Sequence, residues 1–308
     1  MDTKYIQNFL KVIQSGSMSE AARQLDISPA AVAQQMRVLE QTLGVVLLVR
    51  HGRSVRPTAA GERLFERGQQ LVQDCDQLRE WVASDTDHGE LRLGTVNTAL
   101  HGFLPDVMRA FVARHESVRV TVRVGLTPDL YTALLQSTLD AALCLKPSFD
   151  LPKTVSWAAL RQEPLVLLVP GADAAQDPLH LLRTRPLVRY DRELAGGKLA
   201  DRYLKALGIA PRERLELNSV LAVAMMVEQG LGVGLVPDIG QALTRQRPVC
   251  ALALPPLPHG HGLASSPSRE LGLLWLNTSA RIRWVRSLLE CARLCQTDDS
   301  AGFATAGV

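Results

Sequence analysis

The chain has 308 residues, more than one hydrophobic core usually accommodates, so two or three domains are expected. Hydrophobic residues make up 46% and charged residues 21%, which is typical of a folded globular protein and excludes a disordered chain. The net charge of +3 comes from residues 1–60, which hold seven Lys or Arg against four Asp or Glu. Three of these cations lie between Arg50 and Arg56, indicating either a polyanion partner or a solvated loop.

Neither a membrane span nor a secretion signal is indicated by the sequence. Apolar runs such as 165–169 are too short to cross a bilayer, and the N-terminus has no basic cluster followed by an apolar core. The five scattered cysteines favour buried, reduced thiols over disulfides, and Cys291 and Cys295 have no second pair at metal-ligand spacing. We therefore expect a cytoplasmic protein with no metal or other cofactor.

Two short helical patterns near the N-terminus are joined by a tight turn. Apolar residues follow helical spacing over 5–13 and stop at Gly16, and a second pattern covers 18–25. Ser28 and Pro29 mark the start of a third helix, because a serine side chain caps free amides and proline suits the first turn. Helices this small cannot form separate cores, so we expect them to hold the third helix in place.

The third helix, expected over 29–42, has two different sides. One side is apolar and carries Val32, Met36, Leu39 and Leu43. The other side carries small or hydrogen-bonding residues, namely Ala30, Ala33, Gln34 and Arg37. Such a side can approach another surface closely. A strand is expected next at 45–49, and Gly52 turns the chain back towards Val55.

A long helix is expected from residue 58 to about 84, and the following segment to 89 resembles a hinge. Its apolar positions are spaced alternately by four and three residues, at Leu64, Gly68, Leu71, Cys75, Leu78 and Val82. This spacing is typical of a seam that packs against a partner helix. The alternative is that the seam packs against its own domain.

Beyond residue 90, strands alternate with helices, which predicts a mostly parallel α/β sheet covered on both faces. Strands are expected at 91–96, 118–124, 141–145, 165–169, 214–217, 233–236 and 271–276. Helices are expected at 101–115, 128–138, 198–207, 219–229 and 279–294. The small, polar residues 296–308 are expected to be disordered.

Two glycine- or histidine-rich stretches do not support a cofactor. The glycines at 230–234 follow a helix and precede a strand, the reverse of the order that a dinucleotide-binding loop requires. His259 and His261 lie in a Pro- and Gly-rich loop without further ligands, which makes a weak metal site. The chain also lacks the hydrolase, zinc-protease and phosphate-loop motifs, so no enzyme is expected.

Taken together, the chain resembles a LysR-type transcriptional regulator over nearly its whole length. The residues that match the N-terminal part of that family are Ala21, Ala22, Leu25, Ser28, Leu39, Glu40, Leu43, Gly44, Arg50, Arg53, Pro57, Thr58, Gly61 and Glu62. The stretch 226–237, "MVEQGLGVGLVP", resembles the family's signature in its ligand-binding part. The resemblance implies a winged helix-turn-helix at 1–60 and a linker and dimerisation helix with hinge at 61–89.

The same resemblance implies a two-lobed effector-binding α/β domain at 90–295. Lobe I would comprise about 90–160 and 266–295, lobe II about 161–265, and the chain would cross twice between them. A periplasmic-type binding protein is the alternative, but it would explain neither the first 60 residues nor the missing signal peptide.

By resemblance, the third helix enters the major groove of promoter DNA and the turn at Arg53 forms a wing over the adjacent minor groove. The DNA-binding candidates are Ser28, Pro29, Ala30, Ala33, Gln34, Arg37, Arg50 and Arg53. Pro29 and Ala33 depart from the polar residues common in the family and offer bases no donor, so Gln34 and Arg37 are expected to read more of the operator.

The resemblance also implies a homodimer or homotetramer on an inverted repeat, a small organic effector, and contact with RNA polymerase. The dimerisation candidates are Leu64, Leu71, Leu78 and Val82. The effector-binding candidates are Asn97, Thr98, Thr127, Lys146, Asn218 and Ser219. Lys146 as a cation favours a carboxylate or an amino acid. The alternatives are that Thr98 and Asn218 only cap helices and that Lys146 is a solvated surface charge.

Overall fold

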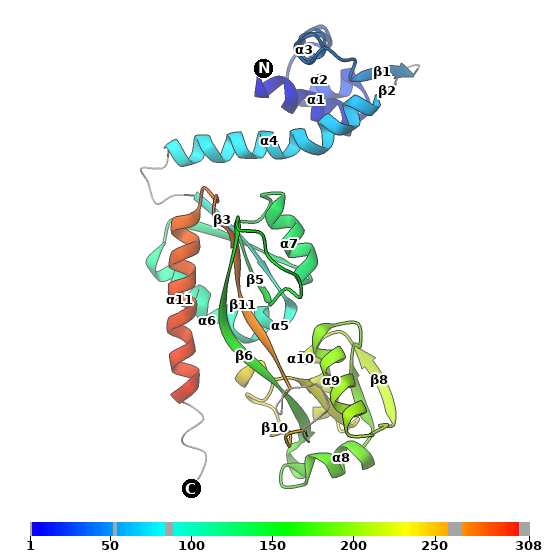
Figure 1. Cartoon of the computed structure of the whole chain (residues 1–308), viewed down its shortest axis with the longest axis vertical. Helices are drawn as coiled ribbons and strands as arrows, with labels where there is room; N and C mark the ends of the chain where they lie inside the picture. The colour runs from blue at the N-terminus through cyan, green and yellow to red at the C-terminus, as the bar shows by residue number, and fades with distance from the viewer. Residues whose placement is uncertain (1, 52–53, 84–88, 258–266, 302–308) are drawn as a thin grey trace. The chain divides into compact units, whose positions relative to one another are not determined.

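A computed structural model describes residues 2–51, 54–83, 89–257 and 267–301 of the chain. The chain forms two compact units, one from Met1 to Thr86 and the other from Asp87 to Val308 (Figure 1). Each unit has hydrophobic clusters of its own, which is the property that allows a domain to fold by itself.

The first unit contains three short helices, a two-stranded hairpin and a long helix. Its elements are α1 (Thr3–Ser15), α2 (Met18–Gln24), α3 (Pro29–Leu43), β1 (Leu48–His51), β2 (Ser54–Pro57) and α4 (Ala59–Ala83). The four helices expected from the sequence are confirmed. The strand expected at 45–49 was placed too early, because the Glu40 carboxylate accepts hydrogen bonds from the amides of Leu47 and Leu48 and holds the preceding residues in a loop.

Local caps and a shared core explain why these helices form where they do. The Ser28 hydroxyl accepts a hydrogen bond from the Ala31 amide at 3.1 Å, and Pro29 occupies the first turn of α3. Gly16 ends α1 with φ 65°, a left-handed conformation that suits glycine. The buried core of this unit is formed by Ile6, Phe9, Leu10, Val12, Ala21, Ala22, Val32, Met36, Leu39, Leu47 and Val55.

The second unit is a two-lobed α/β structure. In chain order it contains β3 (Gly89–Thr95), α5 (Asn97–Gly102), α6 (Leu104–Arg114), β4 (Val118–Val124), α7 (Thr127–Leu135), β5 (Ala141–Leu145), β6 (Val155–Pro170), η1 (Gly171–Asp173), α8 (Pro178–Thr184), β7 (Leu187–Tyr190), α9 (Ala195–Ala206), β8 (Glu213–Leu217), α10 (Val220–Glu228), β9 (Val233–Pro237), η2 (Gly240–Ala242), β10 (Val249–Ala253), β11 (Ser268–Leu276) and α11 (Ile282–Ala301).

One sheet with the order β4-β3-β5-β11-β6-β9-β7-β8 runs through both lobes, and β10 pairs with β6. The outer pairs of each lobe are parallel, as expected, but β6 and β11 pair antiparallel with their neighbours at the centre. The long strand β6 lies along β11 in lobe I and along β9 and β10 in lobe II (Figure 1). The first of the expected crossings, near residue 160, therefore falls inside a continuous strand.

Separate hydrophobic clusters fill the two lobes. The cluster of lobe I joins residues between 91 and 160 with residues between 271 and 292. Two further clusters of residues between 165 and 257 lie in lobe II. Long-range packing therefore returns the C-terminal strand and helix to lobe I.

Several expected elements of this unit need correction. The single helix expected at 101–115 is two helices, α5 and α6, interrupted at Phe103, and Pro105 lies in the first turn of α6. Strands β7 and β10 and helix α8 were not predicted, because their short apolar runs lack a clear periodicity. Helix α11 continues to Ala301, so residues 296–301, expected to be disordered, are helical. The remaining tail, 302–308, lies outside the described residues.

Candidate functional site

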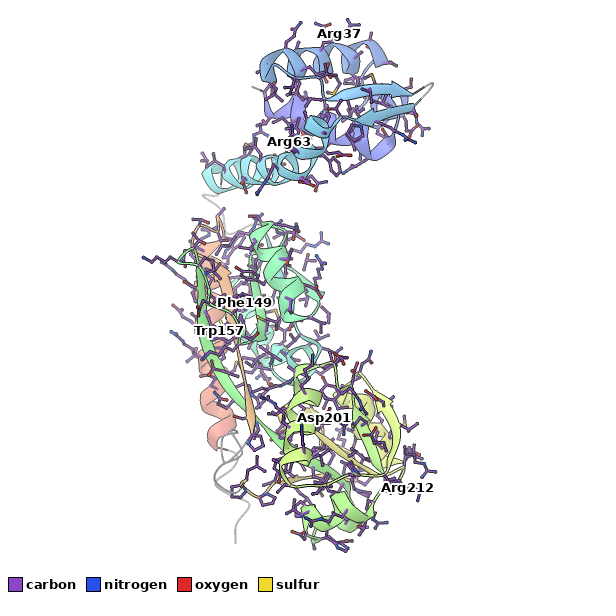
Figure 2. All side chains as sticks on the ribbon, turned by 45° about the vertical axis from the view of Figure 1, so that its right-hand side comes forward. Arg37, Arg63, Phe149, Trp157, Asp201 and Arg212 are labelled. Carbon is purple, nitrogen blue, oxygen red and sulfur yellow. The ribbon has the colours of Figure 1, made fainter. Side chains whose placement is uncertain are left out.

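Helix α3 presents a small, polar face to solvent while its other side is buried. Val32, Met36 and Leu39 have exposed fractions of 2% or less. Gln34 and Arg37 are exposed, and Arg37 projects away from the unit (Figure 2). Among the other DNA-binding candidates on this element, Ser28, Pro29 and Ala30 are exposed and Ala33 is half-buried. The residues expected to read DNA thus form one accessible face.

The hairpin beside α3 is anchored by hydrogen bonds on both sides. Glu40 of α3 binds the Leu47 amide at 2.7 Å, and the Thr58 hydroxyl donates to the Val46 carbonyl at 2.7 Å. A Cβ at Gly61 would lie 2.2 Å from the Leu47 carbonyl oxygen, so only glycine permits this approach of α4. Arg50 lies in β1, whereas Arg53 lies outside the described residues. The expected wing is therefore held rigidly at its base.

The apolar seam of α4 divides into two parts. Leu64 packs against the core of the first unit, and a Cβ at Gly68 would meet the Ile6 side chain at 2.9 Å. Leu71, Leu78 and Val82 are 38%, 56% and 74% exposed. The alternative interpretation, packing within the domain, therefore applies to the first part, while the second part is an uncovered apolar stripe.

Thr98 belongs to a buried polar cluster where the two lobes meet. Its hydroxyl accepts a hydrogen bond at 2.7 Å from Nη2 of Arg269 on β11. Arg269 also binds the Glu163 carboxylate of β6, with Nε and Nη2 at 2.7 and 2.6 Å from Oε2. Burial raises the pKa of the nearby Tyr190 hydroxyl on β7, and the neighbouring Arg269 opposes this rise. Thr98 therefore comes from lobe I, Tyr190 comes from lobe II, and Arg269 and Glu163 come from the two central strands.

Lys146 makes a separate ion pair with Glu270. Its Nζ lies 3.3 Å from the Glu270 carboxylate, which also accepts hydrogen bonds from Trp157 and Gln162. Arg269 and Glu270 are consecutive residues of β11, so their side chains point to opposite faces of the sheet. Thr98 and Lys146, expected to face one ligand, are thus attached to opposite faces of β11.

The remaining effector candidates have structural partners or are exposed. The Thr127 hydroxyl accepts a hydrogen bond from the Leu145 amide at 3.2 Å, which ties α7 to the end of β5. Ser219 caps α10 through the Ala222 amide, so the expected capping role belongs to Ser219 and not to its neighbour Asn218. Asn97 is an exposed residue in the first turn of α5. Thr98 is inside α5 and makes no cap.

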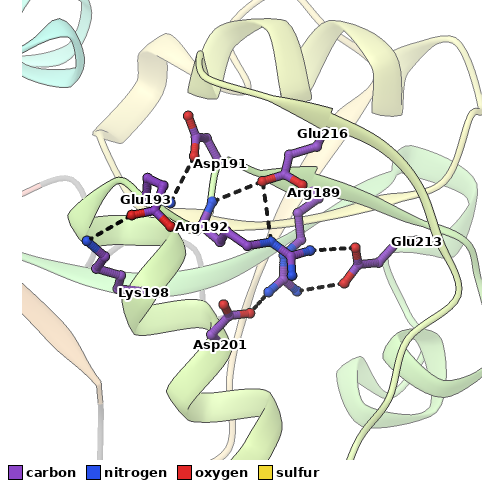
Figure 3. A network of polar contacts seen from close by, with 8 residues as sticks. All are labelled: Arg189, Asp191, Arg192, Glu193, Lys198, Asp201, Glu213 and Glu216. Carbon is purple, nitrogen blue, oxygen red and sulfur yellow. Dashed lines mark hydrogen bonds and ion pairs between the residues drawn. The ribbon is translucent and has the colours of Figure 1, made fainter.

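An ionic network lies on the β8 edge of lobe II (Figure 3). Its centre is Arg189, a buried residue that pairs with Asp201 and lies 3.5 Å from Glu213. Burial lowers the pKa of Arg189, and the nearby Glu213 carboxylate partly offsets this. Together with Asp191, Arg192, Glu193, Lys198 and Glu216, the network contains five carboxylates against three cations. Exposed Arg212 and Arg214 lie on the same edge, which therefore carries charges of both signs.

Two of the five cysteines have buried thiols whose pKa is raised. All five cysteines are free, and burial raises the pKa of Cys144 to about 12 and raises that of Cys291. Thiols in this state are poor nucleophiles and metal ligands. Within the described ranges there is no cluster of three or more metal-binding side chains and no helix able to span a membrane. His259 and His261 lie outside those ranges.

Three residues of the lobe junction were not predicted from the sequence, namely Arg269, Glu163 and Tyr190. Arg269 and Glu163 face each other across β11 and β6, but they are 106 residues apart in the chain. No local spacing could have indicated this pairing. The sequence does show a Glu and an Arg at the ends of apolar strand segments. Such residues are usually exposed, so their positions did not indicate a buried pair.

Comparisons with known proteins cover almost the whole chain. Residues 3–62 match the model of the bacterial regulatory helix-turn-helix protein, lysR family, and residues 84–294 match the LysR substrate binding domain. The probable regulator LrrA of Synechococcus elongatus is 28% identical over 95% of this chain and 97% of its own length. The regulator CzcR of Bacillus cereus is 27% identical over 77% of this chain and 81% of its own length.

Solved structures share the fold at low sequence identity. A full-length OxyR variant from Pseudomonas aeruginosa has a TM-score of 0.64 at 21% identity, covering 96% of this chain and 95% of that one. CbnR in complex with its target DNA has a TM-score of 0.62 at 20% identity, covering 95% of this chain and 100% of that one.

Proposed function

The chain belongs to the LysR family and is a DNA-binding transcriptional regulator with an effector-binding domain, and from this premise we propose how its residues recognise DNA. Two copies place their α3 helices in successive major grooves of an inverted repeat. Gln34 and Arg37 read base edges, while the small residues Ala30 and Ala33 permit close approach. Arg50 and Arg53 contact phosphates beside the groove.

The observation that carries this proposal is the two-sidedness of α3. Val32, Met36 and Leu39 on its apolar side are buried in the core, while Leu43 at the end of the helix is 37% exposed, so the small, polar face is not needed for folding. The face also has a fixed orientation, because Ser28 caps the start of α3 and Asn8 binds Gln35 at 2.6 Å. Rigid presentation of a few polar groups is what base recognition requires.

Gel-shift and anisotropy measurements with the DNA upstream of the chain's own gene test the proposal. Wild-type protein should bind this duplex more tightly than a scrambled duplex. Arg37→Ala should weaken binding, and Arg109→Ala is the matched control, because Arg109 is an exposed arginine on α6 that pairs only with its neighbour Asp106 in the contacts described. Equal loss in both variants would show a non-specific charge effect and reject the assignment of α3.

Dimerisation is proposed to cover the uncovered stripe of α4. Leu71, Leu78 and Val82 lie on the same side of the helix, and their exposure in one copy leaves apolar area that a second α4 can bury. Leu64 packs partly against the domain core and Gly68 lies against Ile6. The proposed surface therefore centres on Leu71, Leu78 and Val82, and Leu64 stays a candidate at its edge.

The effector-binding units are proposed to supply a second contact between copies. The two ends of the sheet, among the described residues, are the strands β4 and β8. Strand β4 exposes Arg119 and Arg123, whereas β8 exposes Glu213, Arg214 and Glu216 beside the ionic network (Figure 3). Contact of such an edge with a second copy would build a tetramer from two dimers.

We propose that a small organic effector binds at the lobe junction beside Asn97 and Thr98. Thr98 is supported by its contact with Arg269, which brings a cation to the start of α5. Thr127, Asn218 and Ser219 stay candidates for the rim of this site, and Lys146 stays a candidate for a contact from the opposite face of β11. Effector binding would change how the lobes meet and thereby the spacing of the paired DNA-binding units, altering promoter bending and access of RNA polymerase.

A further inference from the structure

The cluster around Arg269 joins four segments through one guanidinium. Thr98 comes from lobe I, Tyr190 comes from lobe II, and Glu163 and Arg269 come from the two central strands. Close by, a Cβ at Gly102 of α5 would lie 2.5 Å from the Ile239 carbonyl oxygen of lobe II. The lobes are therefore in direct contact beside this cluster, and any change in the contact must change the environment of Arg269.

The two charged side chains of the cluster, Glu163 and Arg269, are buried. The side chains of Glu163 and Arg269 are 1% and 9% exposed, and Thr98 and Tyr190 are 4% and 5% exposed. Ions buried to this extent need a partner, because an unpaired buried charge is strongly destabilising. The pair is electrically neutral as a whole, so a ligand that adds net charge here must leave one ion without compensation.

The pair on the opposite face of β11 does not share this constraint. Lys146 is 61% exposed and Glu270 is 22% exposed, so water screens both groups. A ligand held there gains little from charge matching. A ligand in contact with the buried cluster, in contrast, would be selected by its pattern of charges.

We propose that Arg269 and Glu163 recognise the two charged groups of a small α-amino acid, an inference that rests on the proposed effector role of the lobe junction. The ligand carboxylate accepts hydrogen bonds from the Arg269 guanidinium and the Thr98 hydroxyl. The ligand ammonium donates to the Glu163 carboxylate. A zwitterion gives each buried ion an opposite partner and leaves the site neutral, whereas a monoanion or a monocation leaves one of them unmatched.

The test is a thermal-shift screen of the full-length chain with the proteinogenic L-amino acids, each followed by its deaminated acid and its methyl ester. At least one amino acid should raise the melting temperature, since a ligand that binds the native state stabilises it. The deaminated acid and the methyl ester should bind about 30-fold or more weakly, the size expected when one partner of a buried charge pair is removed.

Variants separate ligand recognition from a purely structural ion pair. Glu163→Gln should lose the preference for the amino acid and bind the deaminated acid at least as well, because the uncompensated carboxylate is gone. Arg269→Gln should lose both ligands. Glu270→Gln, on the opposite face of β11, is the matched control and should bind the amino acid as wild type does.

Three results would overturn the proposal. They are a melting-temperature increase by deaminated acids but not by amino acids, an amino-acid shift that is unchanged in both Glu163→Gln and Arg269→Gln, and no shift with any amino acid. If the chain still binds its upstream DNA specifically in these cases, the regulator assignment stands and only the ligand class is wrong. If Arg269→Gln does not fold, the proposal is tested by Glu163→Gln alone, through its preference between the amino acid and the deaminated acid.

Discussion

The exposed face of α3 and the cluster around Arg269 are both recognition surfaces, but the chain builds them differently. The α3 face is formed by residues 29–37 of one helix, whose caps and apolar side are local. The Arg269 cluster joins side chains from α5, β6, β7 and β11, and Thr98 and Arg269 are 171 positions apart in the chain. A surface of the first kind depends on one helix being formed, whereas the second depends on the packing of two lobes.

The largest effect is expected at a buried ion cluster that joins distant residues of the second unit. Asp140 is 3% exposed and accepts three hydrogen bonds from Arg92, and Arg281 lies 3.6 Å away. Asp140→Asn removes the buried charge from between two cations and should lower the stability of the second unit by about 3 kcal/mol or more. The midpoint of urea unfolding, followed by tryptophan fluorescence, measures this loss.

The matched control for Asp140 is Asp106→Asn, which removes a carboxylate from an exposed pair with Arg109. That change should cost less than about 1 kcal/mol. Equal losses of stability in the two variants would mean that the buried ion pairs do not stabilise the second unit more than exposed pairs do.

The next effect concerns α4, whose exposed stripe is expected to become buried only in the dimer. Leu71→Glu places a carboxylate in that interface and should weaken dimerisation and operator binding about 100-fold or more. Sedimentation velocity measures dimerisation, and fluorescence anisotropy measures operator binding. Gln69→Glu adds the same charge on the other side of the helix. This variant should dimerise and bind the operator as the wild-type protein does. A Leu71→Glu protein that remains dimeric would place the interface elsewhere.

A moderate and selective effect is expected on the α3 face. Gln34→Ala removes a side chain that is exposed and unnecessary for the core, so the melting temperature should not change. Discrimination between the operator and single-base variants of it should fall by about 1–3 kcal/mol at the base pair that Gln34 reads. Competition anisotropy with a set of point-mutated duplexes measures this. A uniform loss over all duplexes would indicate a phosphate contact instead.

The smallest effect is expected at the wing. Arg53→Ala should weaken binding to operator and scrambled DNA by similar factors, because a phosphate contact carries no sequence information. The slope of log affinity against log salt should become shallower by about one unit. Anisotropy titrations at several salt concentrations provide the slope. If the slope is unchanged, Arg53 makes no phosphate contact.

Sequence reasoning predicted the features that depend on neighbouring residues. The capped start of α3 at Ser28, the turn at Gly16 and the helix end before Gly230 are all set within a few positions of the chain. The exposed and buried sides of α3 also follow directly from its helical period. These elements were predicted with small errors because the information that fixes them is local.

Features set by distant residues could not be predicted in this way. The expected role of Lys146 as the cation of the effector site stays a prediction, but its ion pair with Glu270 of a neighbouring strand was not predicted. Arg269 was not considered, because its contact with Glu163 depends on the register of β11 against β6. The division of the α4 seam likewise depends on the contact of Gly68 with Ile6 from α1. Strand register and helix docking are properties of the whole fold and leave no periodic pattern.

The central claim is that the exposed face of α3 reads DNA sequence. The most direct measurement is the affinity of the full-length chain for its own upstream duplex and for a scrambled duplex of equal length at physiological salt. We predict a preference of about 1,000-fold or more for the upstream duplex, and loss of that preference in Arg37→Glu. Equal affinity for the two duplexes, or an Arg37→Glu variant that keeps the wild-type preference, would contradict the claim.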